Sequence, residues 1–516
     1  MVLAPLHLLR QTELDYLTMD YLAEVTMSIL HKQMIRDSNK GWATDLQVWL
    51  EAGGLSELRD KDVRLVTNAG GANPHACAKM VLALARTIDW WHCRVAIVDG
   101  DDMLALIGSL EEEGTGLSFD PAYEVDRVAD AELTRDLLSA NAYLGGGGVA
   151  RALELGADIV ITGRVADASL ITGCMLHAAG WAGIAEAEGA AVAGPVHAWA
   201  PESVDSPLDV LAAWTVAGHL IECGAQVTGG NATDWATIED LANVGYPVAE
   251  VGFDGSVVIS KPENTGGVVN RRVVAEQLLY EIGDPSAYIT PDAIIDITEV
   301  TLTEIGKDRV EMKGARGLAP TPWLKVSACR IDGWFAASEL IVPGQDCLSR
   351  AQRMDEVLRA RLEHLTELHI HTEYLGAGAL SPPALRPPVE LFEVVVRWAA
   401  SSPRRGDIET FGMAIAPLVL TSPAGVSGMG ARARPRQQLR FIPLLVKRGL
   451  IEQAVRVRTF QSRAGRLADR HNWIEDSMFS RLQRMSERRN EHRLRGRLAE
   501  GLLRRLVEPA EEEVRH

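Results

Sequence analysis

The sequence predicts an α/β fold with a mostly parallel sheet and helices on both faces. Three short apolar runs, 64–67, 94–98 and 158–161, each end in a polar, glycine-rich turn, and a helical pattern follows every turn. Repeated strand, turn and helix is typical of βαβ units with a parallel sheet. Ligands of such sheets bind beyond the carboxyl ends of the strands, where these turns lie. The same pattern therefore predicts both the fold class and the place of a ligand site.

Composition narrows the class of protein. Of the 516 residues, 47% are apolar and 24% charged, which is typical of a globular protein with more than one domain. The formal charge of −18 argues against general nucleic-acid binding, because phosphate contacts need clustered Lys and Arg. The six cysteines form no C-x-x-C pair, and no apolar run approaches the length of a membrane span. We therefore predict a cytoplasmic protein with neither nucleic acid nor membrane as partner.

The pattern of elements predicts three parts. Residues 1–285 form the α/β domain, and 286–460 form a smaller α+β domain, for which a ferredoxin-like arrangement is one candidate. Residues 461–516 are predicted to form an arginine-rich C-terminal helix, since nine arginines and three glutamates fall within 481–505. A solvated helical face explains this pattern most simply, with oligomer contacts or an acidic partner as alternatives. We expect a homo-oligomer.

Two further segments receive a specific prediction. Residues 13–35 are predicted to form one helix, because Leu17, Tyr21 and Val25 recur at helical spacing. Residues 413–419, Met-Ala-Ile-Ala-Pro-Leu-Val, are predicted to be a strand of the second domain.

The glycine-rich turns supply the candidate ligand-binding residues. Glycines let a backbone approach a ligand closely, and free N–H groups at the start of a helix attract anions. A tight turn at 68–75 and a flexible hinge at 141–148 are the structural alternatives, and His75 is either a ligand contact or a solvated surface residue. The ligand-binding candidates are Asn68, Gly70, Gly71, His75, Asn141, Gly145, Gly146, Gly147, Arg164 and Thr228.

Acidic residues at strand ends suggest proton transfer. Asp99, Asp101 and Asp102 fall within four residues, so repulsion should raise the pKa of at least one of them, or the three should share a divalent cation. Helix capping by Asp101 or Asp102 is the structural alternative. Arg164 is placed either to clamp an anionic ligand or to pair internally with Asp167. Asp167 itself is either a helix cap or a base.

A histidine and a glutamate lie three residues apart within a predicted helix, 208–224. His219 and Glu222 would share one face, which suits a general acid/base pair or two metal ligands, although a lone helical histidine is more often a core residue. No motif for a redox cofactor is visible, so we expect no cofactor beyond a cation at Asp99, Asp101 and Asp102. The catalytic candidates are Asp101, Asp102, Asp167, His219 and Glu222.

The order of motifs resembles a known family. LDYLTMDYLAEVTMSIL, NAGGANPHACA, DGDD, NAYLGGGG, GADIVITGRVADAS and TVAGHLIECGAQVTGG are similar to segments of the acyclic terpene utilisation (AtuA-like) proteins. The resemblance implies bacterial breakdown of citronellol- and geraniol-type terpenoids through acyl-CoA intermediates. Relatives usually carry a strand and a glycine-rich loop before LDYLT, so we expect one edge of the pocket to be absent here. The positions carried over are Asn68, Asp101, Asp102, Asn141, Arg164, Asp167, His219, Glu222 and Thr228.

These observations together predict an enzyme, a lyase, hydratase or related acid/base catalyst. Its substrate would be a branched, terpenoid- or polyketide-like acyl thioester or carboxylic acid, a small anionic molecule. Hydration or dehydration, C–C lysis and cyclisation are the candidate reactions, in breakdown or in biosynthesis. The alternative is a non-catalytic acyl-CoA-binding or scaffold protein that assists a carboxylase or synthase.

Overall fold

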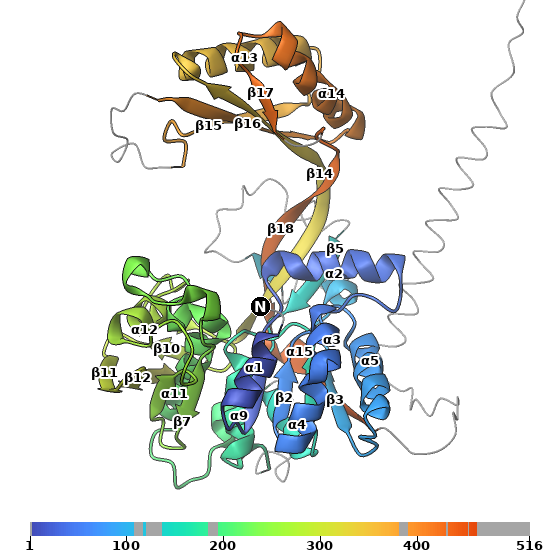
Figure 1. The fold of residues 1–516 in the computed structure, drawn as a ribbon. Coiled ribbons are helices and arrows are strands. Elements are labelled where there is room, and N and C mark those ends of the chain that lie inside the picture. The colour runs from blue at the N-terminus through green and yellow to red at the C-terminus, as the bar shows by residue number, and fades with distance from the viewer. Residues whose placement is uncertain are drawn as a thin grey trace, which may run out of the picture. The chain divides into compact units, whose positions relative to one another are not determined.

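The computed structural model describes residues 3–107, 117–119, 137–183, 194–380, 391–429, 432–452 and 454–461 (Figure 1). The chain forms two compact units. The first comprises the described residues within Met1–Glu132, Ser139–Ala328 and Pro443–His516, and the second those within Leu133–Leu138 and Cys329–Ile442. The arginine-rich segment 462–516 lies outside the described residues. The domain boundaries at 285 and 460 remain predictions.

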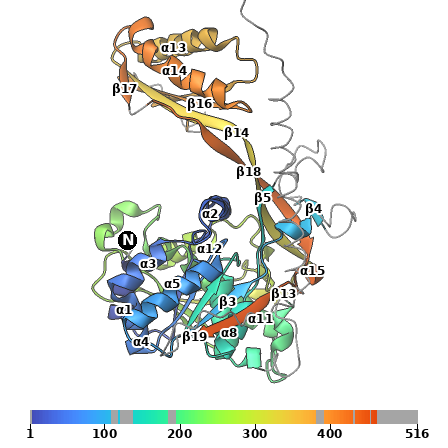
Figure 2. The ribbon, with the colours of Figure 1, turned by 90° about the vertical axis from the view of Figure 1, so that its right-hand side faces the viewer.

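A five-stranded sheet is the base of the first unit. Its order is β1 (Tyr16–Met19), β2 (Arg64–Thr67), β6 (Ile159–Thr162), β3 (Arg94–Asp99) and β19 (Arg456–Gln461). The first four strands are parallel, and β19 runs antiparallel to β3 at the edge of the sheet (Figure 2). The predicted parallel sheet and its three predicted strands are thereby confirmed.

Helices cover this sheet on both faces. Val95 and Ile97 of β3 pack in one hydrophobic cluster with Val81 of α5 (Pro74–Thr87). Side chains alternate along a strand, so Val98 points to the other face. There it approaches α8 (Gly147–Glu154) so closely that a Cβ on Gly148 would lie 2.5 Å from Val98 Cγ1. A further helix, α9 (Ser169–Ala178), contacts β1 and β2. The predicted mixed α/β class is confirmed.

A second, antiparallel sheet belongs to the same unit. Its order is β11 (Thr301–Gly306), β12 (Arg309–Lys313), β8 (Val257–Ser260) and β7 (Val248–Val251). The long helix α11 (Pro207–Glu222) contacts β7, β8 and α9, so it connects this sheet with the helical layer of the first sheet. The same unit also contains a three-stranded sheet, whose order is β13 (Arg316–Leu318), β10 (Ile294–Asp296) and β9 (Tyr288–Ile289).

The second unit combines antiparallel strands with two helices. Strands β15 (His369–Leu375) and β16 (Glu393–Ser402) pair with each other, and β16 pairs with β14 (Trp323–Pro343). Helices α13 (Cys347–Leu362) and α14 (Arg405–Thr421) both contact β16. Trp398, Phe411 and Leu358 lie in the core that these elements enclose. Strands β14 and β18 (Arg436–Lys447) each include residues of both units.

Two segment predictions are wrong. Residues 13–35 are not one helix: β1 comes first, and α2 (Glu24–Arg36) follows. The helical spacing of apolar residues was misleading because β1 is stabilised by pairing with β2, which lies far along the chain. Residues 413–419 lie within α14 rather than in a strand. A short apolar run does not distinguish the two, and here Ile415 and Leu418 pack into the core as one helical face.

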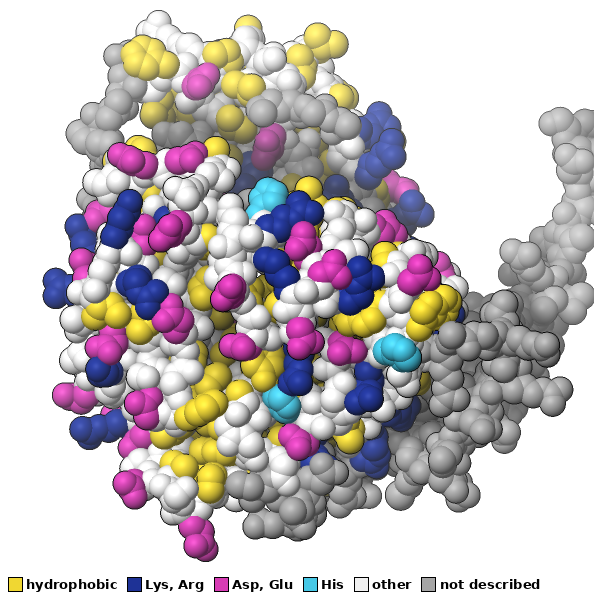
Figure 3. Space-filling model, turned by 60° about the horizontal axis from the view of Figure 1, so that its bottom comes forward, with side chains coloured by type: hydrophobic (Ala, Val, Ile, Leu, Met, Phe, Trp, Pro, Cys, Tyr) yellow, Lys and Arg dark blue, Asp and Glu magenta, His cyan; other side chains and the backbone are white. Residues whose placement is uncertain are grey.

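Among the residues that the structure describes, every helix is too short or too polar to cross a bilayer. Charged side chains of both signs are interspersed over the face of the molecule drawn in Figure 3.

Candidate functional site

An apolar groove lies in the first unit between two sheets. Its volume is about 800 Å³, and β1 and β7 form two of its walls. Each of these strands is an edge strand of its own sheet. Ile171, Cys174 and Met175 of α9 line the groove between them, and Phe253 lies beside β7. The walls are therefore suited to an apolar chain.

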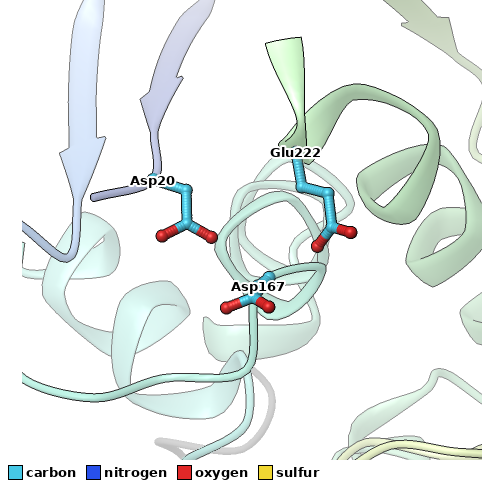
Figure 4. A group of neighbouring side chains, drawn as sticks. All are labelled: Asp20, Asp167 and Glu222. Carbon is cyan, nitrogen blue, oxygen red and sulfur yellow. The ribbon is translucent and has the colours of Figure 1, made fainter. Parts of the chain in front are cut away.

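Three carboxylates meet beside this groove, whose lining also includes the acidic residues Glu13, Asp15, Asp45 and Glu250. Asp20 directly follows β1, Asp167 lies in the turn between β6 and α9, and Glu222 is the last residue of α11 (Figure 4). One oxygen from each lies within 4.8 Å of the others. Asp20 and Glu222 also line the groove. A largely apolar groove with acidic groups in its lining can hold a hydrophobic chain and act on a polar group that the chain carries.

Asp20 is fixed by the backbone around it and by Asn68. Asn68 Nδ2 donates a hydrogen bond of 2.6 Å to Asp20 Oδ1, and the Leu22 N–H donates to the same oxygen at 2.9 Å. Asn68 Oδ1 in turn accepts from the Tyr21 N–H at 2.8 Å. Asn68, predicted as a ligand-binding residue, thus contacts a carboxylate of the cluster and orients it.

Arg164 is enclosed by groups of the protein. Its side chain is 1% exposed, and Nη2 lies 2.9 Å from Asp167 Oδ1. Nη1 donates to the Leu22 carbonyl at 2.7 Å, and the guanidinium stacks over the Tyr143 ring at 4.1 Å. The internal pair with Asp167 is the alternative that the structure shows. Burial, together with the charges of Asp20 and Glu222, raises the pKa of Asp167 to about 8, although Arg164 opposes this shift.

His219 faces Glu222 with a fixed ring orientation. Its Nε2 lies 3.0 Å from the Gln277 carbonyl oxygen, which can only accept, so Nε2 carries a proton. Its Nδ1 lies 3.5 Å from Glu222 Oε1, so Glu222 is the polar neighbour of that nitrogen. Burial raises the pKa of the Glu222 carboxyl, and the neighbouring imidazole opposes that shift. The spacing of three residues does place both side chains together, as predicted.

Asp101 connects three of the predicted turns. Its Oδ2 accepts hydrogen bonds of 2.8 Å from the Arg164 N–H and from Asn141 Nδ2. The side chain is buried, and burial raises its pKa to about 7. Asp102, by contrast, accepts from the Leu104 N–H at 3.0 Å, the capping role that we considered. The turns at 101, 141 and 164 are thus held together by hydrogen bonds.

Other predicted residues have partners outside the carboxylate cluster. His75 Nε2 lies 3.2 Å from Asp99 Oδ2, and Arg458 lies 3.7 Å from the same oxygen. Thr228 donates to the Gly245 carbonyl. The carboxylates of Asp99, Asp101 and Asp102 therefore have separate partners, and a cation shared by them stays a prediction.

The predicted glycines serve close contacts within the fold. A Cβ on Gly70 would lie 2.4 Å from the Thr162 carbonyl oxygen, which ends β6. The Gly146 N–H donates to Asp292 Oδ1 at 3.0 Å, and a Cβ on Gly145 would lie 2.3 Å from that same oxygen. Gly71 has a φ of +49°, and Gly147 is buried at the start of α8.

Asp20 and the groove walls were not predicted. Asp20 was not predicted because its segment was assigned to a helix. The run Tyr-Leu-Thr-Met-Asp that ends at Asp20 nevertheless has the same form as Val-Ala-Ile-Val-Asp, which ends at Asp99. An apolar run that ends in an acid was therefore the available signal. The apolar wall residues, such as Ile171 and Met175, have nothing in the sequence that distinguishes them from core.

Fold and site define an α/β protein with a largely apolar groove beside a cluster of three carboxylates. The model of the acyclic terpene utilisation family protein AtuA matches residues 1–196 and 186–457 of the chain. The chain belongs to this family, as its motifs indicated. Among proteins with a curated description, none matches. The same holds for the solved structures.

Proposed function

We propose that the protein is an enzyme that holds a branched acyl chain in the groove and performs acid/base chemistry on its polar end. The observation that carries this proposal is that Asp20 and Glu222, which belong to one carboxylate cluster, line a largely apolar groove. The family's association with acyclic terpene utilisation supports a branched hydrocarbon substrate. The substrate class is a terpenoid-like acyl thioester or carboxylic acid.

The size and lining of the groove suit this class. A volume of about 800 Å³ falls within the range of roughly 300–1,000 Å³ that is usual for small-molecule sites. Methyl branches of the substrate would contact Ile171, Met175 and Phe253, where burial of apolar surface stabilises binding. The carbonyl end would then lie near the carboxylates.

The reaction classes are hydration or dehydration, C–C lysis and cyclisation. Each requires a proton to be taken from, or given to, an atom close to the carbonyl group. Glu222, supported by His219, would move this proton, while Asp20 is held in one orientation by Asn68. Arg164 would support Asp167 rather than contact the substrate, because its guanidinium is already enclosed.

Activity on a panel of branched acyl-CoAs and free acids tests the proposal. We expect turnover by the wild-type protein, and a loss of about 10²-fold or more in kcat in Glu222→Gln and Asp20→Asn. Asp205→Asn, at an exposed position away from the groove, is the matched control and should retain activity. Tight binding of the acyl compounds without any turnover would contradict the enzyme and favour the acyl-CoA-binding scaffold.

A further inference from the structure

We propose that the hydroxyl of Tyr16 binds a neutral oxygen atom of the substrate, far along the chain from its acyl end. The ligand class is a branched acyl chain that carries a ketone, ether or hydroxyl group as well. This inference rests on the proposed function, because it assumes that the groove holds the chain. It adds a second point of polar recognition, separate from Asp20 and Glu222.

Tyr16 lies at the opposite end of β1 from Asp20, and both residues line the groove. Tyr16 begins the strand and Asp20 directly follows it, so a rise of roughly 3.3 Å per residue separates their backbones by about 13 Å. Apolar side chains of α9, among them Cys174 and Met175, line the same groove. A chain that runs along β1 would therefore meet Asp20 at one end and Tyr16 at the other.

Two side chains from neighbouring elements hold the Tyr16 hydroxyl. Its oxygen lies 2.8 Å from Nδ1 of His177, which belongs to α9. Arg64 is the residue of β2 that pairs with Tyr16, and its Nη1 lies 3.2 Å from His177 Nε2 and 3.3 Å from Nδ1. Burial, together with the charge of Arg64, lowers the pKa of His177. The imidazole is therefore neutral near neutral pH.

The hydrogen bonds of this group leave the proton of Tyr16 available. A guanidinium can only donate, and a neutral imidazole has one nitrogen that accepts and one that donates. Arg64 therefore donates to Nε2, the nearer nitrogen, and Nδ1 carries the ring proton. Nδ1 then donates to the Tyr16 oxygen. Burial raises the pKa of Tyr16 to about 12, so the hydroxyl keeps its own proton near neutral pH.

A ligand oxygen would complete the hydrogen bonding of this hydroxyl. Over the described ranges of the chain, no carbonyl or carboxylate oxygen accepts a hydrogen bond from Tyr16. A ligand that displaces water from the hydroxyl must therefore supply an acceptor, or the donor is left without a hydrogen bond. Glu13 and Asp15 also line the groove, so their charges favour a neutral oxygen over a carboxylate.

Binding of two matched acyl chains tests the inference without any turnover. Both probes are N-acetylcysteamine thioesters of one branched chain, which ends in a methyl ketone or in an isopropenyl group. The second probe thus replaces the ketone oxygen with CH₂. We expect the ratio of their affinities, measured by calorimetry, to shift by about fivefold or more against the ketone in Tyr16→Phe. Affinity for the isopropenyl probe should change by less than about twofold, because phenylalanine keeps the ring.

Two further variants control for an effect on the fold. Tyr374→Phe, in the second unit, is the matched control and should leave the ratio unchanged. His177→Phe removes the donor that orients the hydroxyl, so it should shift the ratio in the same direction as Tyr16→Phe. Circular dichroism verifies that each variant is folded, and His177→Phe decides if Tyr16→Phe is not.

The outcomes separate this inference from the proposed function. Binding of both probes with an unchanged ratio in Tyr16→Phe would overturn the inference alone. Equal losses for the two probes would also overturn it, because they would show lost packing rather than a lost hydrogen bond. Absence of binding of either probe to the wild type would overturn the proposed function as well, since the groove would then not hold an acyl chain.

Discussion

Asp101 is a buried acid whose hydrogen-bond donors, the Arg164 N–H and the Asn141 amide, are both neutral. Burial raises the pKa of its carboxyl to about 7, so the folded protein keeps a proton that the unfolded chain releases at lower pH. Stability therefore falls as pH rises from the ordinary pKa of Asp to the raised one. Between these two pKa values, the free energy of unfolding falls by up to about 1.4 kcal/mol for each pH unit.

We expect Asp101→Asn to remove this part of the pH dependence. An asparagine Oδ1 can accept from the same two donors without carrying a charge. Urea unfolding between about pH 5 and pH 7 should therefore show a shallower fall in the free energy of unfolding for the variant. Equal slopes for wild type and variant would mean that Asp101 does not hold the proton.

Arg164 should matter far more to stability than an exposed arginine does. It is buried against Asp167, the Leu22 carbonyl and Tyr143. Removing one partner of a buried ion pair leaves the other charge uncompensated, so Arg164→Ala should lower the free energy of unfolding by about 3–5 kcal/mol. Arg10→Ala removes the more exposed pair with Glu57 and should cost about 1 kcal/mol or less. Similar losses in the two variants, measured by urea unfolding, would contradict this account.

Among the elements, α8 and α9 approach each other through glycine. A Cβ on Gly173 of α9 would lie 2.5 Å from Val149 Cβ and 2.8 Å from the Gly146 carbonyl oxygen. Gly173→Ala should therefore force the helices apart and lower the free energy of unfolding by about 1–3 kcal/mol. Gly283→Ala, where a Cβ would meet open space, should change it by less than about 0.5 kcal/mol. Thermal unfolding of both variants tests the difference. An unaltered melting temperature in Gly173→Ala would contradict the close packing of α8 against α9 at this glycine.

Local sequence patterns explain which strands and helices could be predicted. Strands β2, β3 and β6 have buried apolar runs followed by glycine turns, so sequence alone located them. Strand β1 has four residues, and its pairing with β2 is not visible in local periodicity. Asp167 was found because it follows a recognisable strand, and Glu222 because it lies three residues after His219 in a recognisable helix, whereas Asp20 was not predicted because its strand was not. Helical spacing placed His219 beside Glu222 correctly, but its contact with Gln277 depends on a helix more than fifty residues away.

In the molecule as a whole, the groove lies between two sheets, and no local sequence pattern predicts that these sheets are neighbours. Ala178, at the end of α9, lines it from an exposed position. Ala178→Phe should fill part of the groove and weaken binding of long branched acyl chains by about tenfold, with less effect on short ones. Ala52→Phe, at an exposed position elsewhere in the first unit, is the control. Calorimetry with a series of chain lengths measures the effect, and equal losses for short and long chains would show that the chain does not bind there.

The position of Asp292 affects which part of a thioester substrate the protein could recognise. Its buried carboxylate accepts from the Gly146 N–H and from Ser169 Oγ, so it occupies the start of α8, a position where many nucleotide-binding proteins hold a phosphate. A coenzyme's diphosphate would have to displace this buried side chain from the start of α8. We therefore expect the start of α8 not to bind the nucleotide part of a thioester, and the protein to distinguish its ligands by their hydrocarbon shape rather than by their carrier.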